Sequence, residues 1–225
     1  MPGIFDAFGL GESLPDPLPS EPFELLEAWF REARERGVQA NPDAMTLATS
    51  TGDGWPSARV VLCKAIEVGS GSLVFYTNRN SRKGREMQSN PRAAACFHWD
   101  ALSRQARVEG TVAPVSEGES DAYFASRPWE NRLGAWASEQ SEPIETREAL
   151  LERVAEAIAR LGLDLGELMT APDRVRIPRP PHWGGFRLEA RRVELWLGGV
   201  GRIHDRAAWE RYGAGSAWRR TRLQP

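Results

Sequence analysis

The sequence has few of the residues from which metal and disulfide sites are built. It contains two cysteines and three histidines, and they form no CxxC, Cys/His or HExxH spacing. We therefore predict no metal site. Cys63 and Cys96 each lie within an apolar strand pattern, and we expect buried free thiols there, with a disulfide or reactive pair as the alternative.

A basic excess, a basic leader and long apolar runs near the N-terminus are also missing. The chain of 225 residues has a net charge of -2 at pH 7, which argues against a general nucleic-acid binder. Residues 1–20 show no basic start and no small-residue cleavage site, so we expect neither a signal peptide nor a membrane anchor, and a cytoplasmic location. Because these residues are rich in proline, glycine and acidic groups, we predict a mobile arm over 1–20.

Lysine is nearly absent, although arginine is abundant. Lys64 and Lys83 are the two lysines among 29 basic residues, and both fall in the stretch 59–90. That stretch reads as two apolar strands followed by a polar corner that opens a short helix at Ser81. Cations, hydroxyls and a helix N-terminus converge there, and free backbone N–H groups favour an anion. We therefore predict a phosphate-binding site in this region.

Short strand patterns with tight turns fill much of the chain. The predicted strands cover residues 45–50, 58–64, 73–78, 93–99, 104–115, 182–190, 191–199 and 216–225. Predicted helices begin after a Ser20 cap, at Ser81, within 117–137 and at Thr146, and 162–181 reads as a proline-rich connector. Such a pattern favours an α+β fold, in which an antiparallel sheet closes into a barrel with peripheral helices. We expect one domain over 21–225.

Arg202, His204 and Arg206 alternate along the chain, so an extended segment would place all three on one face. Two arginines and a histidine on one face repel each other unless an anion or a carboxylate lies opposite. The alternative is a solvated polar face with Asp205 and Glu210 nearby.

Several other residues also allow two interpretations. Tyr123 and Arg127 share one face of a predicted helix, which is otherwise ordinary surface. Gln105 stands among apolar residues of a strand and would need a buried partner. Trp196 would face the core, and Gly184-Gly185 permits a bulge or a close backbone approach.

A set of motifs gives these residues a common context. They are RVVLCK, VFYTNRNSRKGRE, NPRAAACFHW, RQARVEG, YFASRP, GAWASEQS, HWGGFRL and VELWLGGVGRIHDR with a closing RLQP. In order and spacing they resemble the pyridoxine/pyridoxamine 5′-phosphate oxidases, over roughly residues 20–225. The resemblance implies a split β-barrel flavoprotein that works as a homodimer, with FMN at the subunit interface.

The resemblance also implies which residues form the site. FMN contacts would be Arg59, Val60, Val61, Leu62, Cys63, Lys64, Tyr76, Thr77, Ser81, Arg82, Lys83, Gln105, Gln140, Ser141, Trp196 and Arg206. Substrate contacts would be Lys64, Tyr123, Arg127, Asn131, Arg202 and His204. The last two would lie over the pyridine ring as the catalytic residues.

The implied reaction moves a hydride from the C4′ carbon of pyridoxamine or pyridoxine 5′-phosphate to the flavin. Oxygen then reoxidises the flavin, giving pyridoxal 5′-phosphate and hydrogen peroxide. The chain departs from the family pattern twice: Asn131 stands where a serine is usual, and residues 1–20 lack an Arg-x-x-Tyr element. Two alternatives stay open, namely a divergent FMN oxidase of the phenazine-pathway type and a non-catalytic flavin-binding protein.

Overall fold

The computed structural model describes residues 12–213 and 215–225. Its strands are β1 (Ala44–Ser50), β2 (Pro56–Glu67), β3 (Ser72–Asn78), β4 (Arg92–Trp99), β5 (Arg104–Pro114), β6 (Trp183–Leu197), β7 (Asp205–Glu210) and β8 (Arg219–Leu223). Its α-helices are α2 (Phe23–Glu35), α3 (Arg82–Ser89), α4 (Glu117–Ala125), α5 (Trp129–Ala137), α6 (Arg147–Arg160) and α7 (Leu165–Thr170). Short 3₁₀ turns are η1 (Asp100–Leu102), η2 (Pro172–Arg174) and η3 (Val200–Arg202). Within this described part of the chain, no helix is both long and apolar enough to cross a membrane.

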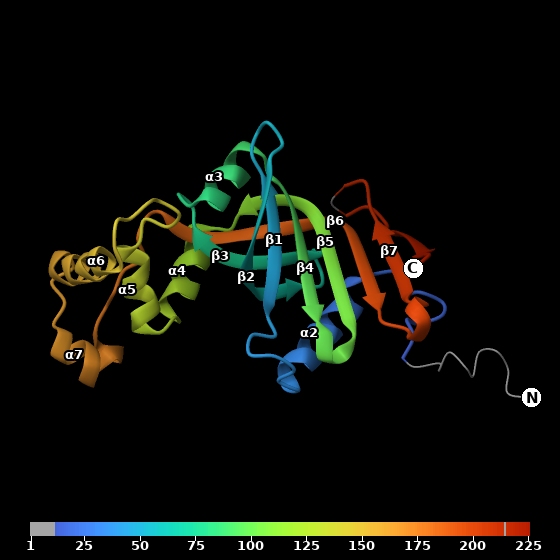
Figure 1. Cartoon of the computed structure of the whole chain (residues 1–225), viewed down its shortest axis with the longest axis horizontal. Coiled ribbons are helices and arrows are strands. Elements are labelled where there is room, and N and C mark those ends of the chain that lie inside the picture. Colours follow the sequence, from blue (N-terminus) through green and yellow to red (C-terminus); the bar gives the residue numbers. More distant parts are fainter. Residues whose placement is uncertain (1–11, 214) are drawn as a thin grey trace, which may run out of the picture. The chain divides into compact units, whose positions relative to one another are not determined.

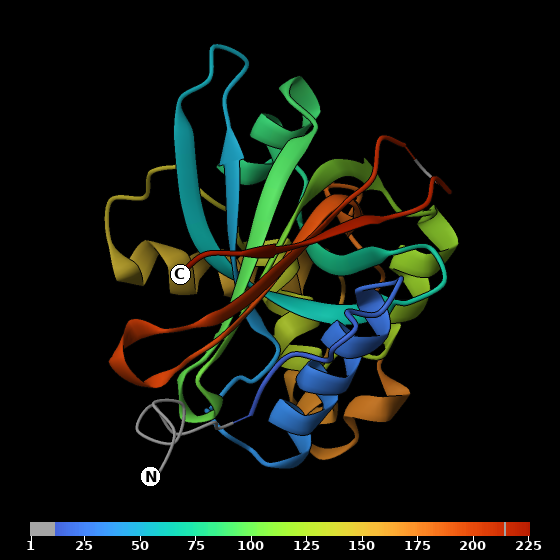
Figure 2. The ribbon, with the colours of Figure 1, turned by 90° about the vertical axis from the view of Figure 1, so that its right-hand side faces the viewer.

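The strands form one antiparallel sheet that closes on itself. The strand order is β3-β2-β1-β4-β5-β6-β7-β8, and a further pairing of β3 with β6 closes six of the strands into a barrel (Figures 1 and 2). Burial alternates along β1: Met45 and Leu47 point inward, whereas Thr46 is exposed. This period of two is what a sheet with one buried face requires. The predicted α+β split barrel is confirmed.

β1 and β2 pair as an antiparallel hairpin. Ser50 lies opposite Pro56, and the turn between the strands uses Gly54 at a φ of 95°, a conformation that glycine adopts without strain. The C-terminal strands differ from the prediction. Residues 183–197 form one continuous strand rather than two, and β7 occupies a segment that the sequence left outside the strands.

The described chain divides into two compact units. The first contains the residues up to Phe75, Asn90–Ala113 and Arg187–Pro225. In it α2 packs on the barrel, where the Phe30 ring meets Phe97 edge-on at 5.8 Å. The helix begins after Pro22 without a side-chain cap, so the predicted Ser20 cap is wrong.

Part of the predicted arm packs against the first unit. Leu14 and Leu18 are buried, and the backbone N–H of Leu14 donates to Asp205. The Trp209 indole donates to the carbonyl oxygen of Pro19. Residues 14–19 of the predicted arm thus contact the first unit, whereas residues 1–11 lie outside the described residues.

The second unit contains Tyr76–Ser89 and Pro114–Phe186. Thr146 caps α6 as predicted, because its hydroxyl accepts the Ala149 N–H at 3.1 Å. The predicted connector contains α7 and contributes three buried side chains, Leu168, Val175 and Ile177, to the apolar core of this unit. The prediction of a plain surface connector is therefore wrong, because this segment fills the core next to Trp183.

Candidate functional site

Lys83 contacts several predicted site residues of the second unit. Its side chain is buried, and its ammonium donates to Thr77 Oγ1 (3.1 Å), Ser81 Oγ (3.2 Å) and Gln140 Oε1 (2.8 Å). A buried ammonium needs such acceptors, since an unpartnered charge away from water is very costly. The fold thus gathers the end of β3, the start of α3 and the segment after α5 around one cation.

Ser81 opens α3 as predicted. Its hydroxyl donates to the Asn78 carbonyl oxygen (2.7 Å) and accepts the Gly84 N–H (3.3 Å). It therefore satisfies one of the free N–H groups of the first helical turn. The same oxygen also accepts a bond from Lys83, so helix initiation and cation placement depend on one hydroxyl.

Three parallel aromatic rings form a second group in this unit. Tyr76 stacks on Tyr123 with ring centroids 3.9 Å apart, and Trp183 lies parallel to both, at 5.5 Å from Tyr76. The Arg127 guanidinium lies 4.6 Å over the Trp183 ring and 5.4 Å over Phe124. Burial lowers the pKa of Arg127, although cation–π contacts of this kind are favourable. Arg127 is thus held in place by aromatic faces, which excludes the interpretation of Tyr123 and Arg127 as ordinary surface.

Gly185 allows this stack to form. A Cβ atom there would lie 2.6 Å from both the Tyr76 ring and Val115. The Gly185 N–H donates to the buried Ser120 hydroxyl, which fixes the strand at this point. The predicted close backbone approach at Gly184-Gly185 is therefore confirmed.

The remaining predicted residues of the second unit lie outside these two groups. Arg82 is largely exposed and pairs with the buried carboxylate of Glu86 at 2.9 Å. Asn131 is exposed on α5. Ser141 is also exposed and has a positive φ of 77°, which is uncommon for a residue with a side chain. None of these three touches the Lys83 cluster through a hydrogen bond between described side chains.

In the first unit, β2 contains residues 59–64, which were predicted to contact FMN. The Arg59 guanidinium donates to the Leu47 carbonyl oxygen and to the hydroxyls of Thr49 and Ser57. Lys64 forms an ion pair with Asp43 at 2.7 Å. Both cations are thus held by partners within the unit.

Between these two cations, β2 has an apolar exposed face. Val60 and Leu62 point outward and are 65% and 37% exposed, whereas Cys63 points inward and is buried. The outward side of β2 is therefore apolar at these two alternate positions.

A buried carboxylate organises the predicted residues of β6 and β7. Glu194 is only 2% exposed and accepts bonds from the Arg206 guanidinium at 2.6 and 3.1 Å. Trp196 lies opposite Arg206 across the strands and packs 4.7 Å from the His204 ring. Trp196 is half-buried rather than in the core. These contacts place Trp196, His204 and Arg206 together, whereas Arg202 lies in η3 and is exposed.

Three expectations for the first unit are wrong in detail. Arg202, His204 and Arg206 do not share one extended segment, because η3 interrupts it and Arg202 has a φ of 64°. The carboxylate that pairs with Arg206 is Glu194 rather than a solvated Asp205 or Glu210. Gln105 is half-exposed on β5, so it needs no buried partner.

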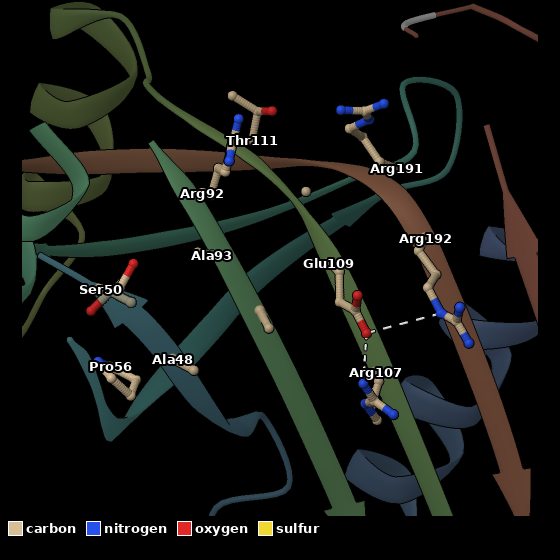
Figure 3. Close-up of a pocket in the computed structure, with 13 residues that line it drawn as sticks. Ala48, Ser50, Pro56, Arg92, Ala93, Arg107, Glu109, Thr111, Arg191 and Arg192 are labelled. Atoms are coloured by element: carbon tan, nitrogen blue, oxygen red, sulfur yellow. Dashed lines mark hydrogen bonds and ion pairs between the residues drawn. The ribbon is translucent and has the colours of Figure 1, made fainter. Parts of the chain in front are cut away.

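A groove of about 560 Å³ crosses the outer face of the sheet in the first unit (Figure 3). Arg107 and Arg192 lie near Glu109 at 2.6 and 4.0 Å, whereas Arg92 and Arg191 have no side-chain ion pair within the described residues. Its lining includes small residues of β1, β4 and β5, namely Ala48, Ala93, Ala94 and Gly110. None of the predicted flavin or substrate residues lines it.

The two cysteines are free, as expected. Cys63 is buried, and burial raises the pKa of its thiol to about 12, so it is an inert thiol at neutral pH. Cys96 is only half-buried, and the expectation of full burial is wrong for it because its strand position faces outward.

Sequence reasoning missed several residues that hold the site residues in place. Asp43 pairs with Lys64, Glu194 pairs with Arg206, and Trp183 contacts both Tyr76 and Arg127. One signal was available for Glu194, since a single acidic residue stands in the apolar run VELWL. Asp43 carries no such signal, because a loop aspartate is ordinarily solvated.

Comparison with known proteins identifies relatives over nearly the whole chain. A family model described as pyridoxamine 5′-phosphate oxidase matches residues 31–160, and one described as the pyridoxine 5′-phosphate oxidase C-terminal dimerisation region matches residues 183–225. A protein of Rubrobacter xylanophilus named pyridoxine/pyridoxamine 5′-phosphate oxidase is 48% identical over 217 residues, which is 96% of this chain and 91% of that protein. A protein of the same name from Maricaulis maris is 48% identical over 205 residues, 91% of this chain and 86% of that protein.

Solved structures agree on the fold. PhzG from Burkholderia lata 383, in complex with tetrahydrophenazine-1-carboxylic acid, is 35% identical with a TM-score of 0.81, covering 93% of this chain and 95% of PhzG. A pyridoxamine 5′-phosphate oxidase-related, FMN binding protein from Nostoc punctiforme has a TM-score of 0.68 at 17% identity, covering 92% of this chain and all of that one. The second likeness shows the fold alone.

Proposed function

The chain belongs to the pyridoxamine 5′-phosphate oxidase family, and on this premise we propose that it is an FMN-dependent oxidase of phosphorylated B6 vitamers. It would convert pyridoxamine or pyridoxine 5′-phosphate to pyridoxal 5′-phosphate, with O2 as electron acceptor and H2O2 as product. The single observation that carries the proposal is the buried Lys83 cluster, because its ammonium, hydroxyls and helix start suit a phosphate anion.

The residues around Lys83 fit the phosphate end of FMN. Thr77, Ser81 and Gln140 each accept a hydrogen bond from Lys83, so the cation is already oriented before any ligand arrives. When bound, FMN supplies the redox chemistry by accepting a hydride at its ring. In the proposal Arg59, Lys64, Gln105, Trp196 and Arg206 also contact this cofactor.

Substrate binding is assigned to a second set of residues. Among the described residues, one buried nitrogen of Arg127 has no hydrogen-bond partner, and Trp183 orients the guanidinium. Arg127 can therefore donate a hydrogen bond to a phosphate oxygen. Tyr123 stacks beside it, and Lys64 and Asn131 complete the proposed phosphate contacts. Remote phosphate binding of this kind positions the reacting carbon without taking part in the chemistry.

Arg202 and His204 are the residues that we propose to lie over the pyridine ring. His204 Nδ1 accepts the Gly199 N–H at 3.1 Å, and its ring packs against Trp196. The bond from Gly199 places the proton of a neutral imidazole on Nε2, which leaves a donor facing away from the backbone. Arg202 is exposed and is available to a ligand.

A homodimer is the proposed assembly, with FMN at the interface between subunits. The family match of residues 183–225 to a dimerisation region supports it, and so do the outward apolar side chains Val60 and Leu62. Light scattering of the purified protein would give the mass of two chains. A mass of 25.1 kDa, that of one chain, would contradict this assignment.

A second candidate function follows from the likeness to PhzG. An oxidase acting on a reduced phenazine carboxylic acid would use the same fold and flavin but would meet a carboxylate instead of a phosphate dianion. The Arg127 nitrogen that has no hydrogen-bond partner among the described residues suits either anion. The two candidates therefore differ in the substrate that is turned over.

The deciding experiment is an oxidase assay on the purified yellow protein. We expect bound FMN, pyridoxal 5′-phosphate formation and one equivalent of peroxide from pyridoxamine 5′-phosphate, with far slower turnover of unphosphorylated pyridoxamine. Turnover of tetrahydrophenazine-1-carboxylic acid without that of the B6 substrates would favour the second candidate. Bound FMN without turnover of any of these substrates would favour a flavin-binding protein.

A further inference from the structure

Five arginines of the described residues have a buried nitrogen atom without a hydrogen-bond partner; they are Arg79, Arg104, Arg127, Arg132 and Arg192. In three of them another nitrogen of the same guanidinium contacts a carboxylate, as in the pair of Arg79 with Glu117. Arg127 and Arg132 have no side-chain hydrogen bond or ion pair within the described residues. Buried polar atoms without partners are rare in folded proteins, so these two require an explanation.

Both arginines lie where α4 gives way to α5. Arg127 follows the end of α4, and Arg132 lies in the first half of α5, where its backbone N–H donates to the Pro128 carbonyl oxygen at 3.1 Å. The stack on Trp183 and Phe124 holds the Arg127 guanidinium. The charge of Arg132 contributes to the lowered pKa of Arg127, after the larger effect of burial. Neither guanidinium forms an ion pair with a carboxylate of the described residues.

A phosphate monoester would compensate this pair of charges. It carries nearly two negative charges at neutral pH, and guanidinium groups match its oxygens with paired N–H donors. The Arg132 side chain is half-buried, so an anion beside it would be screened less by solvent than on an open surface. The small, rotatable ammonium of a lysine would not supply the same fork.

We propose that Arg132 binds the phosphate group of the substrate together with Arg127. This inference rests on the proposed function and adds to it a specificity residue for phosphorylated over unphosphorylated vitamers. Arg132 acts here by direct contact with the substrate, at a position distant from the reacting carbon.

The test compares the FMN-loaded wild-type protein with Arg132→Gln, Arg132→Lys, Arg127→Gln and the double Gln variant. For Arg132→Gln we expect KM for pyridoxamine 5′-phosphate to rise roughly ten- to a hundredfold, as for loss of a charged hydrogen bond. The kcat value and the bound FMN should stay near those of the wild type. Arg132→Lys keeps the charge but loses the fork, so its KM should be intermediate. Arg147→Gln, on an exposed position of α6, is the matched control and should leave KM unchanged.

A second measurement separates this inference from the proposed function. Inorganic phosphate should raise the Tm of the FMN-loaded wild-type protein, and Arg132→Gln should need roughly tenfold more phosphate for the same rise. If KM and the phosphate dependence of Arg132→Gln both equal the wild-type values, the inference is overturned while the oxidase function stands. If no B6 phosphate is oxidised but the phosphate dependence is still weakened, the proposed function fails while the anion site stands.

Discussion

Glu194→Gln should destabilise the barrel more than any exposed charge substitution nearby. The Glu194 carboxylate is 2% exposed, and its two oxygens lie 2.6 Å from Arg206, 3.3 Å from Arg107 and 3.4 Å from Arg192. The isosteric amide removes the negative charge and turns one acceptor into a donor that faces a guanidinium. Three cations then lose their common partner.

Removing one partner of a buried ion pair costs about 3–5 kcal/mol of unfolding free energy. The lower end, about 3 kcal/mol, applies here because the three arginine side chains are between 26% and 42% exposed and can regain water. For a chain of this length, 1 kcal/mol corresponds to roughly 2–4 °C in Tm. The expected decrease in Tm is therefore roughly 6–12 °C.

The assay is urea-induced unfolding of the FMN-free protein, followed by tryptophan fluorescence at equal chain concentration, since the stability of an oligomer depends on concentration. The control is Glu210→Gln. Glu210 also bridges two arginines, at 2.7 and 3.0 Å, but it is 39% exposed, so its loss should cost less than about 1 kcal/mol. An equal, small loss in both variants would refute the view that burial makes Glu194 decisive.

Three further outcomes are expected. Lys83→Met should raise the Kd for FMN roughly ten- to a hundredfold in a fluorescence titration. The control Arg85→Met, on the exposed side of α3, should change the Kd little. Equal Kd values for the two variants would contradict the Lys83 assignment. Gly185→Ala forces a methyl group to within 2.6 Å of the Tyr76 ring, so melting curves should show a loss of about 1–3 kcal/mol of unfolding free energy. An unchanged Tm would mean that the Tyr76 ring moves aside at no cost. The pKa of Cys63 is raised from 9.0 to about 12, so its contribution to stability is complete below pH 9 and is lost as the pH rises through about 12. The free energy of unfolding in urea should therefore decrease over this pH range more for the wild type than for Cys63→Ala. Parallel pH profiles of the two proteins would contradict the raised pKa.

The strand and helix pattern could be read from the sequence because its signals are local. Short apolar runs separated by turn residues predict the strands β1 to β5, and Thr146 caps its helix as predicted. Errors arose where local signals gave no warning. Residues 183–197 form one strand although Arg191 and Arg192 lie in its middle. Arg191 is exposed to solvent, and Arg192 forms an ion pair with Glu210 on the neighbouring strand.

The resemblance supplied the residues of the site but not their partners. Lys83 was identified together with Thr77 and Ser81, which are near it in sequence, yet the contact with Gln140 spans 57 positions. The aromatic support of Arg127 by Trp183 also spans distant segments of the second unit. Such contacts follow from packing, which no local pattern encodes.

The sequence by itself determined the strands β1 to β5, most of the helices, the closed antiparallel barrel and the family to which the chain belongs. Those properties depend on side-chain periodicity, turn residues and motif spacing, all of which are local. Only the tertiary structure decided which charges have partners. Glu194 pairs with three arginines and Asp43 pairs with Lys64, whereas Arg127 and Arg132 pair with no carboxylate among the described residues. The physical reason is that the energy of a charge depends on its burial and on neighbours within a few ångströms, and these are fixed when distant segments pack.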